Sequence, residues 1–429
     1  MKIFVIVSLF FGLVGLPKCF AQADESRLPS FKDNPSTLWK RAQCIIPAKN
    51  TGEDDSPAIL DAFKKCGRSG RIVFTNTTYH IGRVMRTVGL RDTEIQIRGT
   101  LLWSTDIDYW LNNSIPNGYQ NQSSAWHLGG ERLTVRGFGY GTLDGNGQAW
   151  YDFVKGQSNY PGRPHQITII GAKDSVIEGL RFVQSQMWTM TIRDSDNVLL
   201  QDVYVNSTSS NKNPARNTDG VDGMFSNRLT FRRWHVINGD DCISLKANST
   251  NVLIEDSTFI KGSGFALGSI GQFDGKYERI ENVTMRNTRA IDTKYGAYIK
   301  TFTGDSVGYP PNGGGGGLGH IRNITITGFN YTQGRNEAFQ ITQCVSFQST
   351  PGDCNTSRFN ISDITLRDWY GSMNNTYNAF MRCSKAAEGC RNFRIDAETF
   401  DIKKTGDGTR ADKFACRSVG LPRVGFECT

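Results

Sequence analysis

The stretch Asn251-Val-Leu-Ile-Glu-Asp-Ser-Thr-Phe259 carries the pattern that decides the fold, a short β-branched and aromatic run that opens on an asparagine. Similar runs recur along the chain, at Ser175–Phe182, Asn197–Val205, Asn227–Trp234 and Glu278–Met285. If their anchors are equivalent, the steps are 23, 31, 23 and 26 residues between Ile177, Leu200, Phe231, Ile254 and Ile280. Later anchors lie further apart and indicate longer loops, at Ile321, Ile361 and Ile395.

A repeat of this length cannot bury its own apolar face, and irregular repeats of this kind are typical of a parallel β-helix. The alternatives are a β-sandwich and a propeller. Asn or Gly recurs at the segment ends and two-residue hairpin signals are few, so the pattern favours the β-helix. We therefore expect an all-β solenoid that forms one domain over residues 24–429.

One helix is predicted near the start of this domain. Ser56 is a suitable N-cap, Pro57 suits the first turn, and Gly67 ends the helix. Asp54 and Asp55 complement the helix dipole. The helix has an apolar stripe made of Ile59, Leu60, Ala62 and Phe63. We expect it to cap one end of the core.

Three carboxylates gather in the middle of the chain, at Asp219 and at the adjacent pair Asp240 and Asp241. Asp240 follows Asp219 by 21 residues, close to the repeat length, so successive coils would place the acids side by side. We expect two of the carboxyls to lie about 6.5–9.5 Å apart, the gap that holds a water in inverting glycosidases. Adjacent strand residues face opposite ways, so we expect Gly239 to allow a bulge that turns both acids into one cleft.

An isolated Asp-Asp pair is more often a solvated turn or half of a calcium site. The Asn217-Thr-Asp-Gly220 segment one repeat earlier argues against both interpretations here.

Residues 1–23 have the pattern of a secretory signal peptide, with Lys2, an apolar run from Ile3 to Leu16 and the small-x-small site at Ala21-Gln22-Ala23. We therefore expect a secreted, extracellular protein. No later run of about 18 apolar residues indicates a membrane span. Without the signal, 47 basic and 41 acidic residues leave a charge of +6, which fits weak attraction to a uronic-acid polymer. No Lys/Arg cluster indicates nucleic acid binding.

Eight cysteines of the mature chain fall into near neighbours. In an oxidising compartment we expect the pairs Cys44 with Cys66, Cys344 with Cys354, Cys383 with Cys390, and Cys416 with Cys428, although other pairings remain open. Cys242 is left over, and beside a predicted strand we interpret it as a small buried hydrophobic residue.

Asn-x-Ser/Thr sequences are numerous and are candidate glycosylation sites in a eukaryotic host. They lie at Asn76, Asn112, Asn121, Asn206, Asn248, Asn282, Asn323, Asn330, Asn355, Asn360 and Asn374.

Several motifs together resemble glycoside hydrolase family 28, the pectin-degrading polygalacturonases and their relatives. They are Asp54–Ala58, Leu143–Trp150, Arg163-Pro-His165, Asn217–Gly220, Gly239–Asp241, Gly262–Gly264 with Gly268–Gln272, and Tyr298-Ile-Lys300. The resemblance implies a right-handed parallel β-helix that hydrolyses with inversion and needs no metal or other cofactor. It also implies that Asp240 is the general acid and that Asp219 and Asp241 activate the attacking water.

Two positions depart from the family pattern. Gly264 stands where the family usually has a histidine, and Tyr298 stands where it usually has an arginine. Arginine binds carboxylates bidentately and tyrosine does not, so these departures affect which sugar the site recognises. The candidate substrate-binding residues are Lys300, which would pair with a uronate, Tyr298, which would stack on a sugar face or only pack, and Asn217.

A loop with five consecutive glycines, Tyr309–Gly319, follows Lys300, and we expect it to lie at the cleft. Together with Gly268–Gln272 and Ile341–Cys344 it is similar to the fungal exo-acting branch of the family, which removes terminal galacturonate or terminal rhamnose. Our leading hypothesis is a monomeric exo-hydrolase of pectic polysaccharide that releases terminal galacturonate. An α-L-rhamnosidase is the close alternative. A calcium-dependent β-helix lyase and a non-catalytic polysaccharide-binding β-helix are further alternatives.

Overall fold

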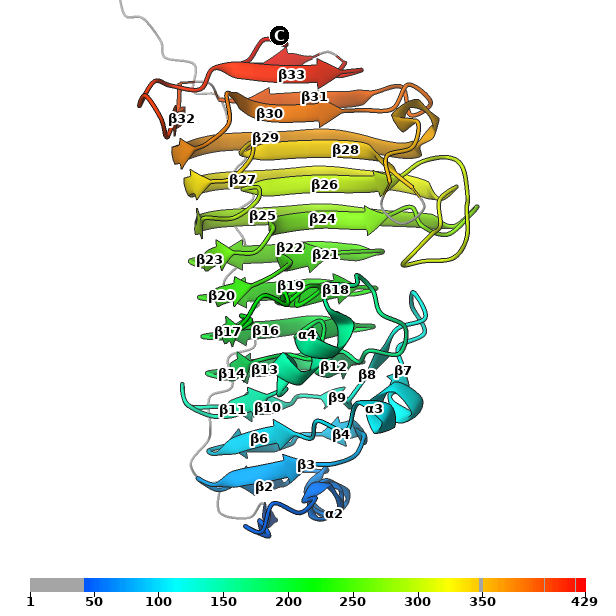
Figure 1. Cartoon of the computed structure of the whole chain (residues 1–429), viewed down its shortest axis with the longest axis vertical. Helices are drawn as coiled ribbons and strands as arrows, with labels where there is room; N and C mark the ends of the chain where they lie inside the picture. The colour runs from blue at the N-terminus through cyan, green and yellow to red at the C-terminus, as the bar shows by residue number, and fades with distance from the viewer. Residues whose placement is uncertain (1–41, 347–349, 397, 421) are drawn as a thin grey trace, which may run out of the picture.

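The computed structural model describes residues 42–346, 350–396, 398–420 and 422–429, so the predicted signal peptide lies outside the described residues. The chain winds into a tall solenoid whose strands lie one above another from the N-terminal to the C-terminal end (Figure 1). Every pairing between successive coils is parallel, apart from one short antiparallel hairpin. The predicted right-handed parallel β-helix is confirmed.

The strands form three stacks, each of which runs along the solenoid. The first stack contains β1 (Gln43–Ile45), β2 (Arg71–Phe74), β5 (Glu94–Ile97), β10 (Thr134–Arg136), β13 (Lys173–Glu178), β16 (Asp196–Gln201), β19 (Asn227–Arg232), β22 (Ser249–Glu255), β25 (Tyr277–Ile291), β27 (Leu318–Gly334), β29 (Arg358–Met373), β31 (Cys390–Ile395) and β34 (Arg423–Val424). The second stack contains β3 (Thr78–Ile81), β6 (Thr100–Trp103), β11 (Thr142–Asp144), β14 (Arg181–Val183), β17 (Tyr204–Asn206), β20 (His235–Asn238), β23 (Thr258–Lys261), the later parts of β25, β27 and β29, and β32 (Phe400–Lys404).

The third stack positions the candidate site. It contains β4 (Met85–Arg91), β9 (Trp126–Glu131), β12 (Ile167–Ile170), β15 (Met190–Arg193), β18 (Val221–Met224), β21 (Asp241–Leu245), β24 (Gly264–Ile270), β26 (Ala297–Phe302), β28 (Phe339–Val345), β30 (Tyr377–Arg382) and β33 (Lys413–Arg417). The remaining elements are the hairpin of β7 (Ile115–Pro116) and β8 (Ser123–Ser124), the helices α2 (Ser56–Cys66), α3 (Ile107–Asn113) and α4 (Gly147–Val154), and a 3₁₀ turn (Cys354–Thr356). None of the helices in the described part of the chain is long and apolar enough to cross a membrane.

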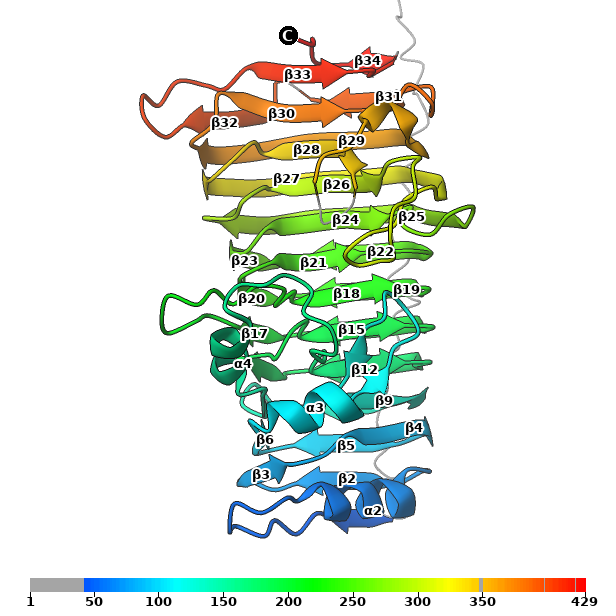
Figure 2. The ribbon, with the colours of Figure 1, turned by 45° about the vertical axis from the view of Figure 1, so that its right-hand side comes forward.

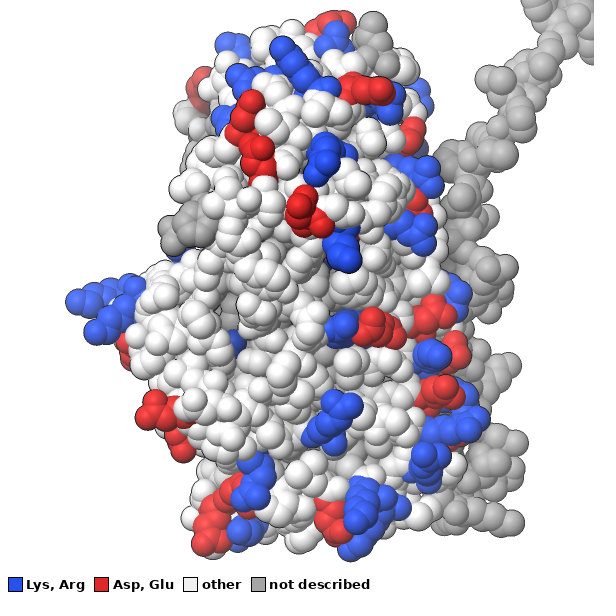
Figure 3. Space-filling model, turned by 90° about the vertical axis from the view of Figure 1, so that its right-hand side faces the viewer, with Lys and Arg blue, Asp and Glu red and all other residues white. Residues whose placement is uncertain are grey.

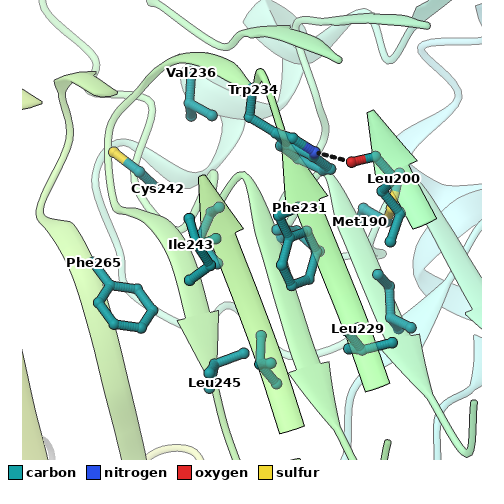
Figure 4. Packing of buried hydrophobic residues seen from close by; sticks show 14 of the residues in the cluster. Met190, Leu200, Leu229, Phe231, Trp234, Val236, Cys242, Ile243, Leu245 and Phe265 are labelled. Carbon is teal, nitrogen blue, oxygen red and sulfur yellow. Dashed lines mark hydrogen bonds between the residues drawn. The ribbon is translucent and has the colours of Figure 1, made fainter. Parts of the chain in front are cut away.

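The core lies between the three stacks. Phe231 pairs in register with Leu200 on one side and with Ile254 on the other, and all three side chains are fully buried. Figure 4 shows Phe231 and Leu200 together with Val236 of the second stack and Ile243 of the third. The Trp234 indole N–H donates to the Leu200 carbonyl oxygen at 3.0 Å. The periodic anchors of the sequence are thus the rungs of one continuous core.

One predicted anchor is wrong. Ile254 pairs with Met285, 31 residues on, whereas Ile280 pairs with Ser249. Both candidates are buried and belong to the single long strand β25, and Asn282 between them adopts a left-handed φ of 56°, so Ile280 lies before the bend and Met285 after it. The expected anchors Ile321 and Ile361 continue the row of Ile280, and Ile395 continues the row of Met285.

A ladder of asparagines runs along the outside of the first stack. Asn282 Nδ2 donates to Asn251 Oδ1 at 3.0 Å, and Asn323 Nδ2 donates to Asn282 Oδ1 at 2.8 Å. All three residues have φ between 55° and 56°, a conformation that asparagine tolerates better than most other residues. These three asparagines therefore both bend the chain and tie one coil to the next.

The predicted capping helix is present as α2, which packs its buried side chains Ile59, Ala62 and Phe63 on the N-terminal end of the core (Figure 2). Its N-cap position is Asp55, and Ser56 is the first helical residue, so the predicted cap is wrong by one residue. Asp55 takes this place because its carboxylate binds the backbone N–H of His80 and of Lys49, both at 2.8 Å, and joins the helix to the first coils.

Four disulfides join the predicted cysteine pairs, and Cys242 is free and buried among the described residues. Cys44–Cys66 links β1 to α2 at the N-terminal end. The other three bridges, Cys344–Cys354, Cys383–Cys390 and Cys416–Cys428, lie in the last coils of the solenoid.

Candidate active site

The three predicted acids lie where the chain enters two neighbouring strands of the third stack. Asp219 precedes β18, Asp240 precedes β21, and Asp241 is the first residue of β21. The Gly220 N–H donates to the Asp241 carbonyl oxygen at 2.9 Å, so the two coils are in register at this point. The repeat spacing thus places the acids together, as the sequence predicts.

Asp240 and Asp241 both reach the same site because the strand is irregular here. A β-bulge shifts the register of β21 on β24 between Asp241 and Ile243. Gly239 fits this bend because a Cβ there would lie 2.0 Å from the carbonyl oxygen of Ala215. The predicted bulge is confirmed, and close backbone approach is the reason for the glycine.

The expected wide separation of the carboxyls is not found. One oxygen of each of Asp219, Asp240 and Asp241 lies within 4.8 Å of the corresponding oxygen of the other two. The reason is that Asp219 and Asp241 stand on directly stacked coils, whose spacing is about 4.8 Å. The additional coil shift that would widen the distance between their carboxyls is absent. This distance is below the range of about 6.5–9.5 Å typical of inverting glycosidases.

Protonation of the cluster follows from burial and mutual repulsion. Burial raises the pKa of Asp219 well above its ordinary value, and the charges of Asp222, Asp240 and Asp241 raise it further. Burial and Asp241 also raise the pKa of Asp240, against the opposing effects of Lys300 and of backbone N–H donors. The cluster therefore holds a proton at a pH where an ordinary carboxyl is ionised, which is what a general acid requires.

The three acids differ in their exposure. Asp219 is 3% exposed and Asp241 is 1% exposed, whereas Asp240 is partly exposed. Asp240 is thus the acid that a substrate reaches first.

Asp241 is held by two donors on β26, two strands beyond β21 in the third stack. The Tyr298 hydroxyl donates to Oδ1, and Lys300 Nζ lies 3.2 Å from Oδ2. Burial lowers the pKa of Lys300, but Asp241, Asp240 and Asp219 outweigh it and the pKa is raised. Lys300 therefore stays charged and compensates the acids.

The two departures from the family pattern lie next to each other in space. Gly264 pairs with Asp241 across β21 and β24, and a Cβ there would lie 2.2 Å from the carbonyl oxygen of Tyr295. With a φ of 92° as well, this position excludes a histidine in the present backbone. Tyr298 is 6% exposed and packs against Tyr295, so its ring is not open to a sugar face and its hydroxyl serves Asp241.

Asn217 connects the acids to a surrounding loop. Its backbone N–H and its Nδ2 donate to Asp240 Oδ2 at 3.2 and 3.3 Å. Its Oδ1 accepts from Asn159 N–H at 2.8 Å and from the Ser158 hydroxyl at 3.2 Å. Asn217 is nearly buried, and in this arrangement it orients the acid.

The sequence analysis did not single out a fourth carboxylate, Asp222 on β18. It is fully buried, its Oδ1 lies 3.1 Å from Lys246 Nζ, and burial raises its pKa to about 7 against the opposing effect of Lys246. Lys246 Nζ lies 4.7 Å from the ring of Trp188. The available signal was an aspartate inside the short apolar strand Val221–Met224, where a charge is unexpected.

The mouth of the site lies among long loops on the third stack. Figure 3 views this side, where most charged side chains lie along one edge and at the two ends, and where the middle is hollowed and largely uncharged. The glycine-rich segment contributes to these loops, as expected, and its Gly314 forms a bridge with Val307, just before the segment.

Comparison with known proteins agrees with this geometry. The model of the glycosyl hydrolases family 28 matches residues 80–420. The chain belongs to this family. Proteins similar to it include alpha-L-rhamnosidase rgxB of Aspergillus niger, 45% identical over 93% of this chain and 92% of the relative. The exopolygalacturonase of Cochliobolus carbonum is 35% identical over 90% of this chain and 86% of the relative.

Solved structures confirm the fold. Endo-xylogalacturonan hydrolase from Aspergillus tubingensis superposes with a TM-score of 0.73 at 24% identity, over 90% of this chain and all of that one. The exopolygalacturonase of Thermotoga maritima gives 0.67 at 14% identity, over 91% and 95%. The predicted family 28 membership and glycoside hydrolase class are thus both confirmed.

Proposed function

We propose that the protein is a secreted exo-acting hydrolase that releases terminal galacturonate from the non-reducing end of pectic oligosaccharides. The observation that carries the exo action is a cavity of about 140 Å³ lined by residues of three different loops, including Gln122, Asn159 and Tyr309. Of these, Asn159 is linked to Asp240 through Asn217. The cavity has room for a single sugar unit. A chain end entering such a cavity would present its first glycosidic bond to Asp240.

The loops are tied to one another and to the acids. Asn312 Nδ2 donates to the Asn159 carbonyl oxygen at 3.4 Å, and Asn159 donates to Asn217, which in turn holds Asp240. On the opposite loop, Gln120 donates to Gln272. These contacts support a closed end next to the catalytic acids.

In this proposal Asp240 protonates the leaving oxygen, and Asp219 and Asp241 activate a water. We propose inversion because neither Asp219 nor Asp241 presents an exposed oxygen for direct attack on the sugar, whereas a water between them would be held by both. The close spacing of the carboxyls is the observation against it, so the stereochemistry needs its own measurement.

Lys300 favours galacturonate over a neutral sugar, because its side chain is 23% exposed beside the acids and remains charged. A second candidate is an α-L-rhamnosidase, which Tyr298 at the arginine position and the 45% identical rhamnosidase support. In this case the terminal sugar carries no carboxylate.

The test uses the purified secreted protein with oligogalacturonate and, separately, with a rhamnose-terminated rhamnogalacturonan oligosaccharide, followed by mass spectrometry of the products. We expect free galacturonate from the first. Free rhamnose from the second alone would replace the proposal by the rhamnosidase. Unsaturated products that absorb in the ultraviolet and disappear with a chelator would indicate a lyase.

The variant Asp240→Asn separates an enzyme from a binding protein. We expect it to lose at least 10³-fold in kcat while it retains affinity for the oligosaccharide, since it keeps the shape of the side chain and removes the proton. A wild-type protein that binds the oligosaccharide without releasing any product would support the non-catalytic alternative.

A further inference from the structure

Arg163 is a buried cation whose two terminal nitrogens have no hydrogen-bond partner among the described residues, and its guanidinium carbon lies 6.0 Å from the centre of the Tyr151 ring. The arginine is 1% exposed, and its Nε donates to the Gln186 carbonyl oxygen. A buried charged group without partners is costly, so a site that retains one points to a missing anion.

This arginine lines the same cavity of about 140 Å³, which is connected to the acids through Asn159 and Asn217. Gln122 lines it as well and is 7% exposed, and both its amide oxygen and its amide nitrogen lack a partner among the described residues. Two of the residues around the cavity thus carry buried polar atoms without a hydrogen-bond partner among the described residues, the Arg163 guanidinium nitrogens and the Gln122 amide.

The cavity is close enough to the acids for the charges to interact. Burial lowers the pKa of Arg163 to about 10, while Tyr151, Asp219 and Asp240 oppose this change. Asn159, also in the wall, donates to Asn217, which holds Asp240. A sugar in the cavity would lie next to the catalytic carboxyls.

Lys300 and Tyr298 lie on β26, two strands beyond β21 in the third stack. Arg163 precedes β12, which lies three strands before β21. The acids therefore lie between Arg163 and Lys300 along the solenoid, and the cavity and Lys300 lie on opposite sides of them.

We propose that Arg163 is a specificity-determining residue whose two terminal nitrogens bind the carboxylate of the terminal uronic acid, with the Gln122 amide on a neighbouring hydroxyl. Guanidinium forks match carboxylates bidentately, and burial strengthens the pair. The substrate class is thus an oligosaccharide whose terminal sugar is a free uronate. A methyl ester at that sugar removes the charge and leaves the guanidinium unpaired. This inference rests on the proposed exo-hydrolysis of galacturonate.

The first test needs only the wild-type protein. Release of the terminal sugar is measured for trigalacturonate and for the same trisaccharide with a methyl ester on its non-reducing end. We expect kcat/KM to be about 10²-fold lower for the ester, the size of a lost charged hydrogen-bond pair. Equal values for the two substrates would overturn the assignment while leaving galacturonate release intact.

The second test uses Arg163→Met and Arg163→Lys, with Arg233→Met as a matched control. Arg233 is 45% exposed and pairs with Asp202 at 2.6 Å on the outside of the solenoid. We expect Arg163→Met to lose about 10²-fold on the free acid and little on the ester, and Arg163→Lys to recover part of the difference. Equal losses on both substrates in a folded variant would assign Arg163 a purely structural role and refute the proposal.

The outcomes also separate this inference from the proposed function. If the wild type releases rhamnose and no galacturonate, both fail. If it releases galacturonate without discriminating the ester, the role of Arg163 alone fails.

Discussion

The buried Asp222 makes a quantitative prediction about stability and pH. Its pKa is raised by burial from 3.8 to about 7, so the folded protein binds a proton there that the unfolded chain releases near pH 4. This contribution to stability is fully present below about pH 4 and is lost as the pH rises towards 7. At 1.36 kcal/mol per pH unit the raised pKa corresponds to at most about 4 kcal/mol.

The perturbation is Asp222→Asn, which has the same shape and does not titrate. We expect the difference in free energy of unfolding between wild type and the variant to be largest near pH 4. This difference should shrink by about 2–4 kcal/mol as the pH rises to 7. The attraction between ionised Asp222 and Lys246 is already contained in the pKa of about 7 and needs no separate term.

The assay is urea unfolding of both proteins at pH 4, 5, 6 and 7, with Asp202→Asn as the control. Asp202 is 47% exposed and pairs with Arg233, so its substitution shifts stability by a small amount. A difference between wild type and Asp222→Asn that stays constant, or that grows with pH, would refute the reasoning.

Three further predictions concern the site and the surface. Tyr298→Phe removes a donor to Asp241, and we expect about a 10–100-fold loss in kcat with a smaller change in KM, measured by steady-state kinetics; an unchanged kcat would show that Lys300 holds Asp241 alone. Proton NMR of the sugar released in the first minutes should show the inverted anomer, and a retained anomer would make one carboxylate a nucleophile. Asn282 and Asn323 donate their Nδ2 atoms within the asparagine ladder, so glycopeptide mass spectrometry should find them unmodified while the exposed Asn76 is free to carry a glycan; glycans on both ladder residues would contradict this.

The repeat pattern was sufficient to predict the solenoid, because each apolar anchor has to meet its equivalent in the next coil. It did not distinguish Ile280 from Met285, since both are buried and a left-handed Asn282 between them decides the register. A five-residue offset inside one long strand leaves no mark on hydrophobic periodicity.

The site was predicted to the extent that its residues share a motif. Asp219, Asp240 and Asp241 came together because they follow the coil repeat. Their separation was overestimated because direct stacking of the coils, which sets it, depends on three-dimensional register. Asp222 was missed because its raised pKa results from burial, which the sequence does not show, and because its strand is only four residues long.

The positions of the disulfides make the two ends of the molecule different from its middle. A stack of coils loses order most readily from its outermost rungs, where each strand has a neighbour on one side only, so fraying is an end effect. The four bridges lie in the first and last coils, whereas the acids lie on central coils held by neighbours above and below. This chain therefore has two separable properties, resistance to exopeptidases and the capacity to cleave sugar bonds. The first depends on the disulfides of the end coils, and the second depends on the packing of the central coils.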